Sequence, residues 1–246
     1  MLINFLILLV SLVPSVLIVL WMTRRKNDPL YKKSCHSAIL RGAISVLPIL
    51  ALSGTLFLLN GAIRLTLLKD VDVLLYKAVY TFVVLAFAEE LIKFLAFRLL
   101  LKKKFCAYSW ADVTALMVII GAMFGLMEDL PYAIDSNAIT MLVRGFTAGH
   151  IGYGFLMGWF YGKRLYTGKK RYGVISFVLP WLIHGLYDFS LTPQLLERND
   201  SFAIVAVLLA LADLVLLTLT ILFFARASKR ERYSMPIAEI EPAVSE

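Results

Sequence analysis

The sequence predicts an all-α membrane protein, a bundle of about seven transmembrane helices with its N-terminus outside and its C-terminus in the cytoplasm. Of the 246 residues, 60% are apolar and only 17% are charged, with a mean hydropathy of +0.80, which is more apolar than soluble domains. Seven stretches are long and apolar enough to cross a bilayer core about 30 Å thick. No segment shows the alternation of polar and apolar residues that is typical of a membrane β-barrel.

We expect the seven predicted spans to be organised in four parts of the chain. The spans cover about residues 2–22, 39–60, 76–101, 110–133, 141–162, 173–192 and 202–225. We expect the first to be a retained span rather than a cleaved signal peptide, because its cations follow the apolar run instead of preceding it. The expected parts are two peripheral spans with a loop (1–75), a four-helix core that carries the candidate site (76–192), the seventh span (193–226) and a disordered cytoplasmic tail (227–246).

Basic residues set the expected orientation and localisation. They gather in alternate loops, near residues 24–41, 98–104, 163–171 and 226–232. Cytoplasmic loops attract Lys and Arg, so these loops are expected inside a cell membrane that the chain crosses several times. The net charge of +8 therefore indicates topology and contact with anionic lipid, not with nucleic acid. Cys35 and Cys106 have no spacing that suggests a disulfide framework or a metal site.

Ionisable residues inside the predicted spans indicate a functional site, because a charge at the bilayer centre costs about 2.5–3.5 kcal/mol on insertion scales. They are Glu89, Glu90 and Lys93 in the third span, Glu128 and Asp129 in the fourth, Arg144 and His150 in the fifth, and His184 and Asp188 in the sixth. One residue in each of three spans lies about 13 positions from a basic helix end, roughly 19 Å along the helix axis. These residues are Glu89, His150 and His184. Their common depth predicts that they form one site.

Helical spacing pairs several of these residues. Glu89 and Lys93 are i, i+4 neighbours, and so are His184 and Asp188. An Asp that accepts a hydrogen bond from one imidazole nitrogen fixes the tautomer and leaves the other nitrogen for water, substrate or metal.

The fifth span combines His150 with small residues. Phe146 lies four positions before His150 and is expected to wall the same helix face. Glycines recur every four residues at 145 and 149 and again at 154, 158 and 162. Such series predict close approach to neighbouring helices.

Four motifs in order resemble the PrsW family, a branch of the CAAX-protease-like intramembrane proteases. They are Glu89-Glu90-Leu-Ile-Lys93, Gly121-Ala-Met-Phe124-Gly125-Leu-Met-Glu128, Arg144 followed by Phe146-Thr-Ala-Gly-His150, and His184-Gly-Leu-Tyr-Asp188. The superfamily pattern is a Glu-Glu pair, Phe-x-x-x-His and His-x-x-x-Asn/Asp on successive helices. Glu128 to Tyr132 adds a PrsW-like Glu-x-x-x-Tyr, whereas Asp129 replaces the usual Asn. The resemblance covers about residues 76–192.

The resemblance implies hydrolysis of a peptide bond in a membrane-anchored protein, for example a protein like the anti-sigma factors that some bacterial members cut. The catalytic residues it implies are Glu89, Glu90, His150, His184 and Asp188. The supporting residues are Lys93, Phe146, Glu128 and Arg144.

Two chemistries are compatible with these residues. In one, the glutamates activate water while the histidines stabilise the oxyanion. In the other, His150 and His184 hold a divalent metal such as zinc together with a Glu. The superfamily pattern slightly favours the metal-independent version. The alternatives to a protease are an ion, proton or metal transporter and a non-catalytic protein that binds a partner helix; against a transporter, no inverted repeat is evident.

Two contacts are predicted from this arrangement. Glu89 or Glu90, His150 and His184 should converge within about 8 Å, which one water or one metal can bridge. Arg144 should contact Glu128 or Asp129, because an unpaired charge at that depth would be costly.

Overall fold

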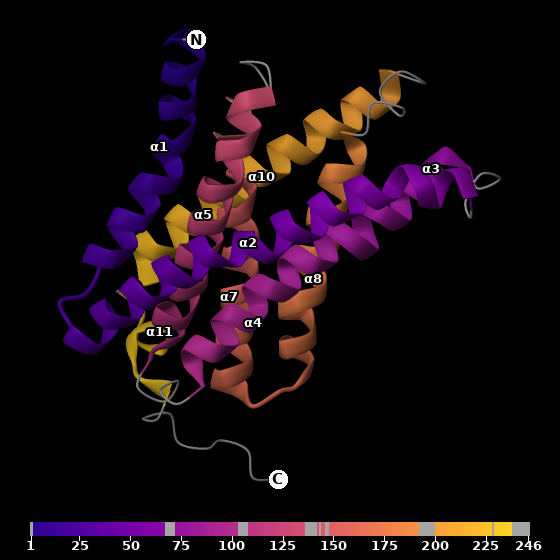
Figure 1. Ribbon diagram of the computed structural model, residues 1–246. Helices are drawn as coiled ribbons and strands as arrows, with labels where there is room; N and C mark the ends of the chain where they lie inside the picture. The colour runs from indigo at the N-terminus through magenta and orange to yellow at the C-terminus, as the bar shows by residue number, and fades with distance from the viewer. Residues whose placement is uncertain are drawn as a thin grey trace.

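All regular elements in the described part of the chain are helices (Figure 1). The structure, a computed structural model, describes residues 2–66, 72–102, 108–135, 142, 144–145, 148–191, 200–227 and 229–237. The helices are α1 (Leu2–Arg24), α2 (Pro29–Thr66), α3 (Val73–Val79), the π-helical η1 (Tyr80–Ala86), α4 (Phe87–Leu101), α5 (Trp110–Asp135), α7 (Gly149–Thr167), α8 (Arg171–Ser190), α10 (Asp200–Ala227) and α11 (Glu231–Ser234). The predicted all-α fold class is confirmed for these residues.

Helix α5 lies at the centre of the bundle. Its residues from Val113 to Ile120 are fully buried, and it packs against α7, α2 and α1. In contrast, α1, α2 and α10 expose many Leu, Ile and Val side chains. This distribution fits helices that face lipid on one side and the rest of the bundle on the other, which is α5 for α1 and α2 and the pair α7 and α8 for α10.

Glycines bring α7 close to α5. A Cβ atom at Gly154 would lie 2.8 Å from the carbonyl oxygen of Met117, and one at Gly158 would lie 2.8 Å from Cα of Thr114. At Gly162 the neighbour would be the ring of Trp110, at 2.3 Å. The predicted series of small residues is therefore a helix–helix contact surface in which glycine permits the approach.

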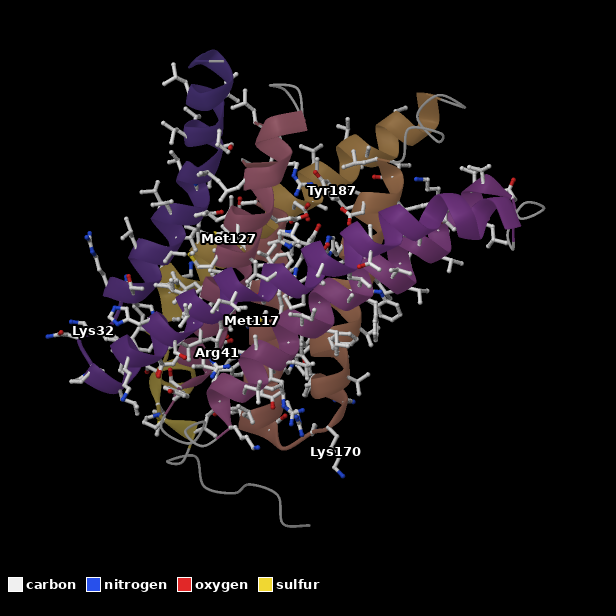
Figure 2. The ribbon with its side chains drawn as sticks, in the orientation of Figure 1. Lys32, Arg41, Met117, Met127, Lys170 and Tyr187 are labelled. Carbon is white, nitrogen blue, oxygen red and sulfur yellow. The ribbon has the colours of Figure 1, made fainter. Side chains whose placement is uncertain are left out.

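Four of the described helices are long and apolar enough to cross a membrane: Leu6–Arg24, Pro29–Leu52, Trp110–Leu130 and Ile204–Ala227. The α1–α2 turn, the α7–α8 turn and α11 lie at one end of the bundle, and the first turns of α1 lie at the other (Figure 1). Lys32, in the first turn of α2, and Lys170, directly before α8, both project outward (Figure 2). The basic segments near these turns thus share one end.

The third predicted span contains an irregular turn directly before its glutamates. Helices α3 and α4 are joined by η1, in which the N–H of Phe87 bonds to the carbonyl oxygen of Phe82. Trp181 of α8 also donates an indole N–H to that oxygen at 2.7 Å. A π-helical segment often marks a functional site, and this one docks the start of α4 against α8.

The fifth predicted span is not one continuous helix. The chain is helical at Arg144 and Gly145, but Ala148 has φ +47° and α7 begins only at Gly149. A left-handed conformation is costly for a residue with a Cβ atom, and such residues cluster at functional sites. His150 therefore lies in the first turn of α7, next to the break.

A short helix of the C-terminal segment, α11, lies against the start of α5. Tyr233 of α11 packs edge-on against Trp110, with ring centroids 4.9 Å apart. The N–H of Ile237 donates to the carbonyl oxygen of Tyr108 at 3.0 Å. Aromatic packing and backbone pairing thus connect Tyr233 and Ile237 to the start of α5. Residues 238–246 lie outside the described part.

The turn between α1 and α2 is fastened to the same end of α5. Asp112, which is 1% exposed, accepts hydrogen bonds from Arg25 and, at 3.2 Å, from Nζ of Lys26. A buried carboxylate needs such partners.

Candidate active site

Four helices bring their ionisable residues together in the interior of the bundle. Helix α4 supplies Glu89, Glu90 and Lys93, α5 supplies Glu128, α7 supplies His150, and α8 supplies His184 and Asp188. Glu89 is 5% exposed, Glu90 0%, Lys93 1% and His184 3%. Because buried charges must be paired, the contacts among these groups determine what the site can do.

His184 lies between three carboxylates. Its Nδ1 donates to Oε1 of Glu90 at 2.9 Å. Its Nε2 lies 3.1 Å from Oδ2 of Asp188 and 3.7 Å from Oε2 of Glu89. Each close contact to an oxygen requires one proton, so His184, Glu90 and Asp188 share at least two protons. This arrangement can accept or release a proton without moving a heavy atom.

His150 is held by two opposite charges. Its Nε2 donates to Oε2 of Glu128 at 2.6 Å, and Nζ of Lys93 lies 2.9 Å from its Nδ1. An ammonium can only donate, so in this arrangement Nδ1 is the acceptor. Glu128 therefore orients His150 much as Asp188 orients His184.

Lys93 pairs mainly with Glu90 rather than with Glu89. Its Nζ donates to Oε1 of Glu90 at 2.6 Å but lies 4.0 Å from Oε2 of Glu89. It also sits 4.3 Å from the ring centroid of Phe124. The spacing of Glu89 and Lys93 had suggested the other pair, but the i, i+3 neighbour lies closer to the ammonium in the folded protein. Glu90 is thus fixed by Lys93 and His184 together.

Arg144 forms the predicted contact with the fourth span. Its guanidinium lies 3.2 Å from Oε1 of Glu128 and 3.1 Å from Oδ1 of Asp129. The three side chains are only 13–18% exposed. Arg144 links the chain before the break at Ala148 to α5, and through Glu128 it supports His150. Phe146, the other supporting residue expected here, lies outside the described residues.

The predicted convergence of the site is also confirmed. One ligand atom each from Glu89, His150 and His184 lies within 4.8 Å of the others. Oε2 of Glu89 is buried and has no hydrogen-bond partner among the described residues. A buried carboxylate oxygen without a donor suits a metal ion or a water.

The donor set fits a divalent metal such as zinc. Two histidines and one glutamate with an open position form a common set of protein ligands in zinc peptidases. Glu128 on Nε2 of His150 and Glu90 on Nδ1 of His184 are carboxylate partners of the kind that orient metal-binding imidazoles. A metal at Nε2 of His184 would take the place of the contact of that nitrogen with Asp188. A metal at Nδ1 of His150 would compete with Lys93 for that nitrogen.

A pocket opens beside the two histidines. It holds about 40 Å³ of space, enough for water. Its lining comes from α1, α5, α7, α8 and α10 and includes Ser15, Glu128, His150, His184 and Asp213. Water can therefore reach the imidazoles in the interior of the bundle.

The sequence profile of the "PrsW family intramembrane metalloprotease" matches residues 33–218, which contain all of these groups. The chain belongs to the PrsW family. The profile match is broader than the expected range of 76–192, because it includes most of α2 and most of α10.

Two curated PrsW proteins align with shorter parts of the chain. Protease PrsW of Shouchella clausii (strain KSM-K16) is 32% identical over 84 residues, which cover 29% of this chain and 39% of that protein. Protease PrsW of Geobacillus kaustophilus (strain HTA426) is 32% identical over 72 residues, covering 28% and 32%. The match thus spans less than half the length of either relative. No solved structure matches the chain.

Two residues at this candidate site were missed by the sequence analysis. Asp213 of α10 lines the pocket, and Tyr153 of α7 packs against His184. The sequence did contain an indication of Asp213. It lies 13 residues before Arg226, which is the same distance from a basic helix end as that of Glu89, His150 and His184. Tyr153 carried no comparable signal, because a tyrosine is common in membrane helices.

Proposed function

We propose that the chain is an intramembrane peptidase that hydrolyses a peptide bond in a membrane-anchored protein, for example an anti-sigma-factor-like protein. The single observation that carries this proposal is the convergence of Glu89, His150 and His184 within 4.8 Å, beside a pocket with room for water. Membership of the PrsW family supports it.

Glu89 is the proposed general base. Its Oε2, which has no hydrogen-bond partner among the described residues, can take the proton of a water held between Glu89 and the two histidines as that water attacks the substrate carbonyl. His184, which shares protons with Glu90 and Asp188, is the proposed donor to the leaving amine. His150, held by Glu128 at Nε2, would stabilise the oxyanion of the tetrahedral intermediate through an N–H at Nδ1, which requires that Nδ1 be protonated and leave its contact with Lys93. Glu90 and Lys93 keep these groups in place.

The same residues would hold a metal in the metalloprotease form of the site. When bound, a zinc ion would polarise the carbonyl and lower the pKa of its water. Glu89, His150 and His184 would be its ligands. Glu128 and Glu90 would then orient the two imidazoles through the ring nitrogens that do not bind the metal.

The proposed topology has seven spans, with the N-terminus outside and the C-terminus in the cytoplasm. The gathering of the basic turns and α11 at one end of the bundle supports it (Figure 1). The positive-inside rule assigns that end to the cytoplasm. Glu89, about 13 residues from the basic end of its span, would then lie near the bilayer midplane.

A substrate trap tests the proposed function. Glu89→Gln is nearly isosteric and removes the ability to ionise, so the variant should bind its substrate without cutting it. An intact membrane-anchored protein should copurify with Glu89→Gln, and the unaltered chain should cleave that protein when it is added. Asp72→Asn is the matched control, because Asn caps the start of α3 about as well as Asp, and it should cleave normally. If the unaltered chain cuts none of the trapped proteins, the peptidase proposal fails.

A further inference from the structure

Asp213 is a buried carboxylate in the apolar middle of α10. It is 1% exposed, whereas Leu211, Leu214 and Val215 of the same helix are exposed. A charged group at the bilayer centre costs about 2.5–3.5 kcal/mol on insertion scales. A residue with this cost is expected to have a specific partner or task, and none of the motifs that define the candidate site includes Asp213.

The partner of Asp213 is Tyr153 of α7. The phenol hydroxyl donates to Oδ2 of Asp213 at 3.1 Å. The other oxygen, Oδ1, has no hydrogen-bond partner among the described residues, and Asp213 lines the pocket beside His184. The carboxylate therefore reaches from α10 to the edge of the candidate active site.

Gly149 makes room for this pair. A Cβ atom at that position would lie 2.9 Å from Oδ2 of Asp213 and 3.1 Å from the hydroxyl oxygen of Tyr153. A side chain at position 149 would clash with both partners of the hydrogen bond. Glycine at the start of α7 therefore allows the Asp213–Tyr153 contact to form.

The ring of Tyr153 contacts both histidines of the site. It stacks on the imidazole of His184, with centroids 5.1 Å apart and planes inclined by 25°. It also meets the imidazole of His150 edge-on, at 5.8 Å and 90°. Glu90 and Asp188 fix His184 in the plane of its ring, while Tyr153 covers one face.

We propose that Asp213 is a positioning residue that acts through Tyr153. By holding the phenol hydroxyl, it fixes the tyrosine ring against His184 and so sets the tilt of that imidazole toward Glu89 and Asp188. The inference rests on the proposed function in that His184 is assigned a catalytic role. It adds the seventh predicted span to the parts of the chain on which the site depends.

Histidine NMR tests this proposal without a substrate. The chain has only three histidines, so ¹⁵N-histidine labelling of the full chain in micelles gives three sets of ring signals. His36 lies on α2, away from the site, and serves as the internal reference. Asp213→Leu and Tyr153→Phe should shift the His184 ring signals and leave those of His36 unchanged. Thr220→Val is the matched control, because among the described residues this buried hydroxyl on α10 bonds only to Leu216 of its own helix.

The kinetics of substrate cleavage distinguish two roles for Asp213: positioning of His184, or only a structural link between α7 and α10. Loss of a group that orients a catalytic histidine typically lowers activity about 10- to 100-fold. Asp213→Leu should show this loss in kcat with KM little changed, and Asp213→Asn, which can still accept from Tyr153, should recover most of it. If Asp213→Leu does not fold, Tyr153→Phe decides, because it removes only the hydroxyl.

Unchanged His184 signals in folded Tyr153→Phe and Asp213→Leu would overturn the proposal, even if the chain proves to be a peptidase. Shifted signals in a chain that cleaves nothing would leave the positioning of His184 intact and contradict the proposed function instead.

Discussion

Gly121 of α5 sets how closely His150 approaches the other active-site groups. A Cβ atom at position 121 would lie 2.2 Å from the carbonyl oxygen of His150, whereas ordinary contacts begin near 3.4 Å. In Gly121→Ala the backbone at His150 must therefore move by about 1.2 Å, the difference between these two distances. Overpacking of this kind costs about 1–3 kcal/mol of stability. A displacement of about 1 Å can reduce a catalytic rate about 100-fold.

The expected result is a folded protein with a modestly lower melting temperature and about 100-fold slower cleavage. Thermal unfolding in detergent and cleavage of a trapped substrate measure the two effects. Gly42→Ala is the matched control, because its Cβ atom would lie 2.6 Å from the carbonyl oxygen of Ile120, on the side of α5 that faces α2. This control should lose comparable stability but retain most of its activity. Normal cleavage by Gly121→Ala, or equal losses of activity in both variants, would refute the reasoning.

Other perturbations test the charge pairs and the metal. Arg144→Ala removes the cation of two partly buried carboxylates and should cost about 3 kcal/mol of stability, measured by thermal unfolding; an unchanged melting temperature would show that the pair is dispensable. Lys93→Met leaves Glu90 buried without its cation and should cost about 3–5 kcal/mol, seen as a lower yield of folded protein, while equal yields would contradict the assigned pairing. Asp188→Asn should slow cleavage less than His184→Ala, because Asn can still accept a hydrogen bond; the reverse order would remove Asp188 from its orienting role. Replacing either active-site histidine by Ala should abolish binding of zinc by the purified chain, measured by elemental analysis, and undiminished binding would place the metal elsewhere.

The convergence of the candidate-site residues could be predicted from the sequence because each one violates a simple rule. Glu89, His150 and His184 are polar at a depth where apolar residues are expected, and helical rise places them at one level. The glycine series of α7 likewise predicts close packing by its spacing alone. Periodicity and hydropathy suffice for such features, since they depend on local sequence.

Features that depend on how helices meet could not be predicted in this way. The break at Ala148 requires a left-handed residue that no glycine or proline marks. Lys93 reaches Glu90 rather than Glu89 because the positions of α7 and α8 decide which carboxylate faces the ammonium. The role of Tyr153 follows from a ring contact between two helices, which spacing along one helix does not reveal.

Comparison of membrane proteomes tests the central claim most directly. Cells that make the intact chain and cells that make Glu89→Gln at the same level would be compared by quantitative mass spectrometry of protein N-termini in their membrane fractions. The account predicts at least one membrane-anchored protein that is cut within or beside its membrane segment with the intact chain and accumulates uncut with Glu89→Gln. Identical sets of N-termini in the two membrane fractions would contradict the assignment of Glu89, His150 and His184 as a peptidase site.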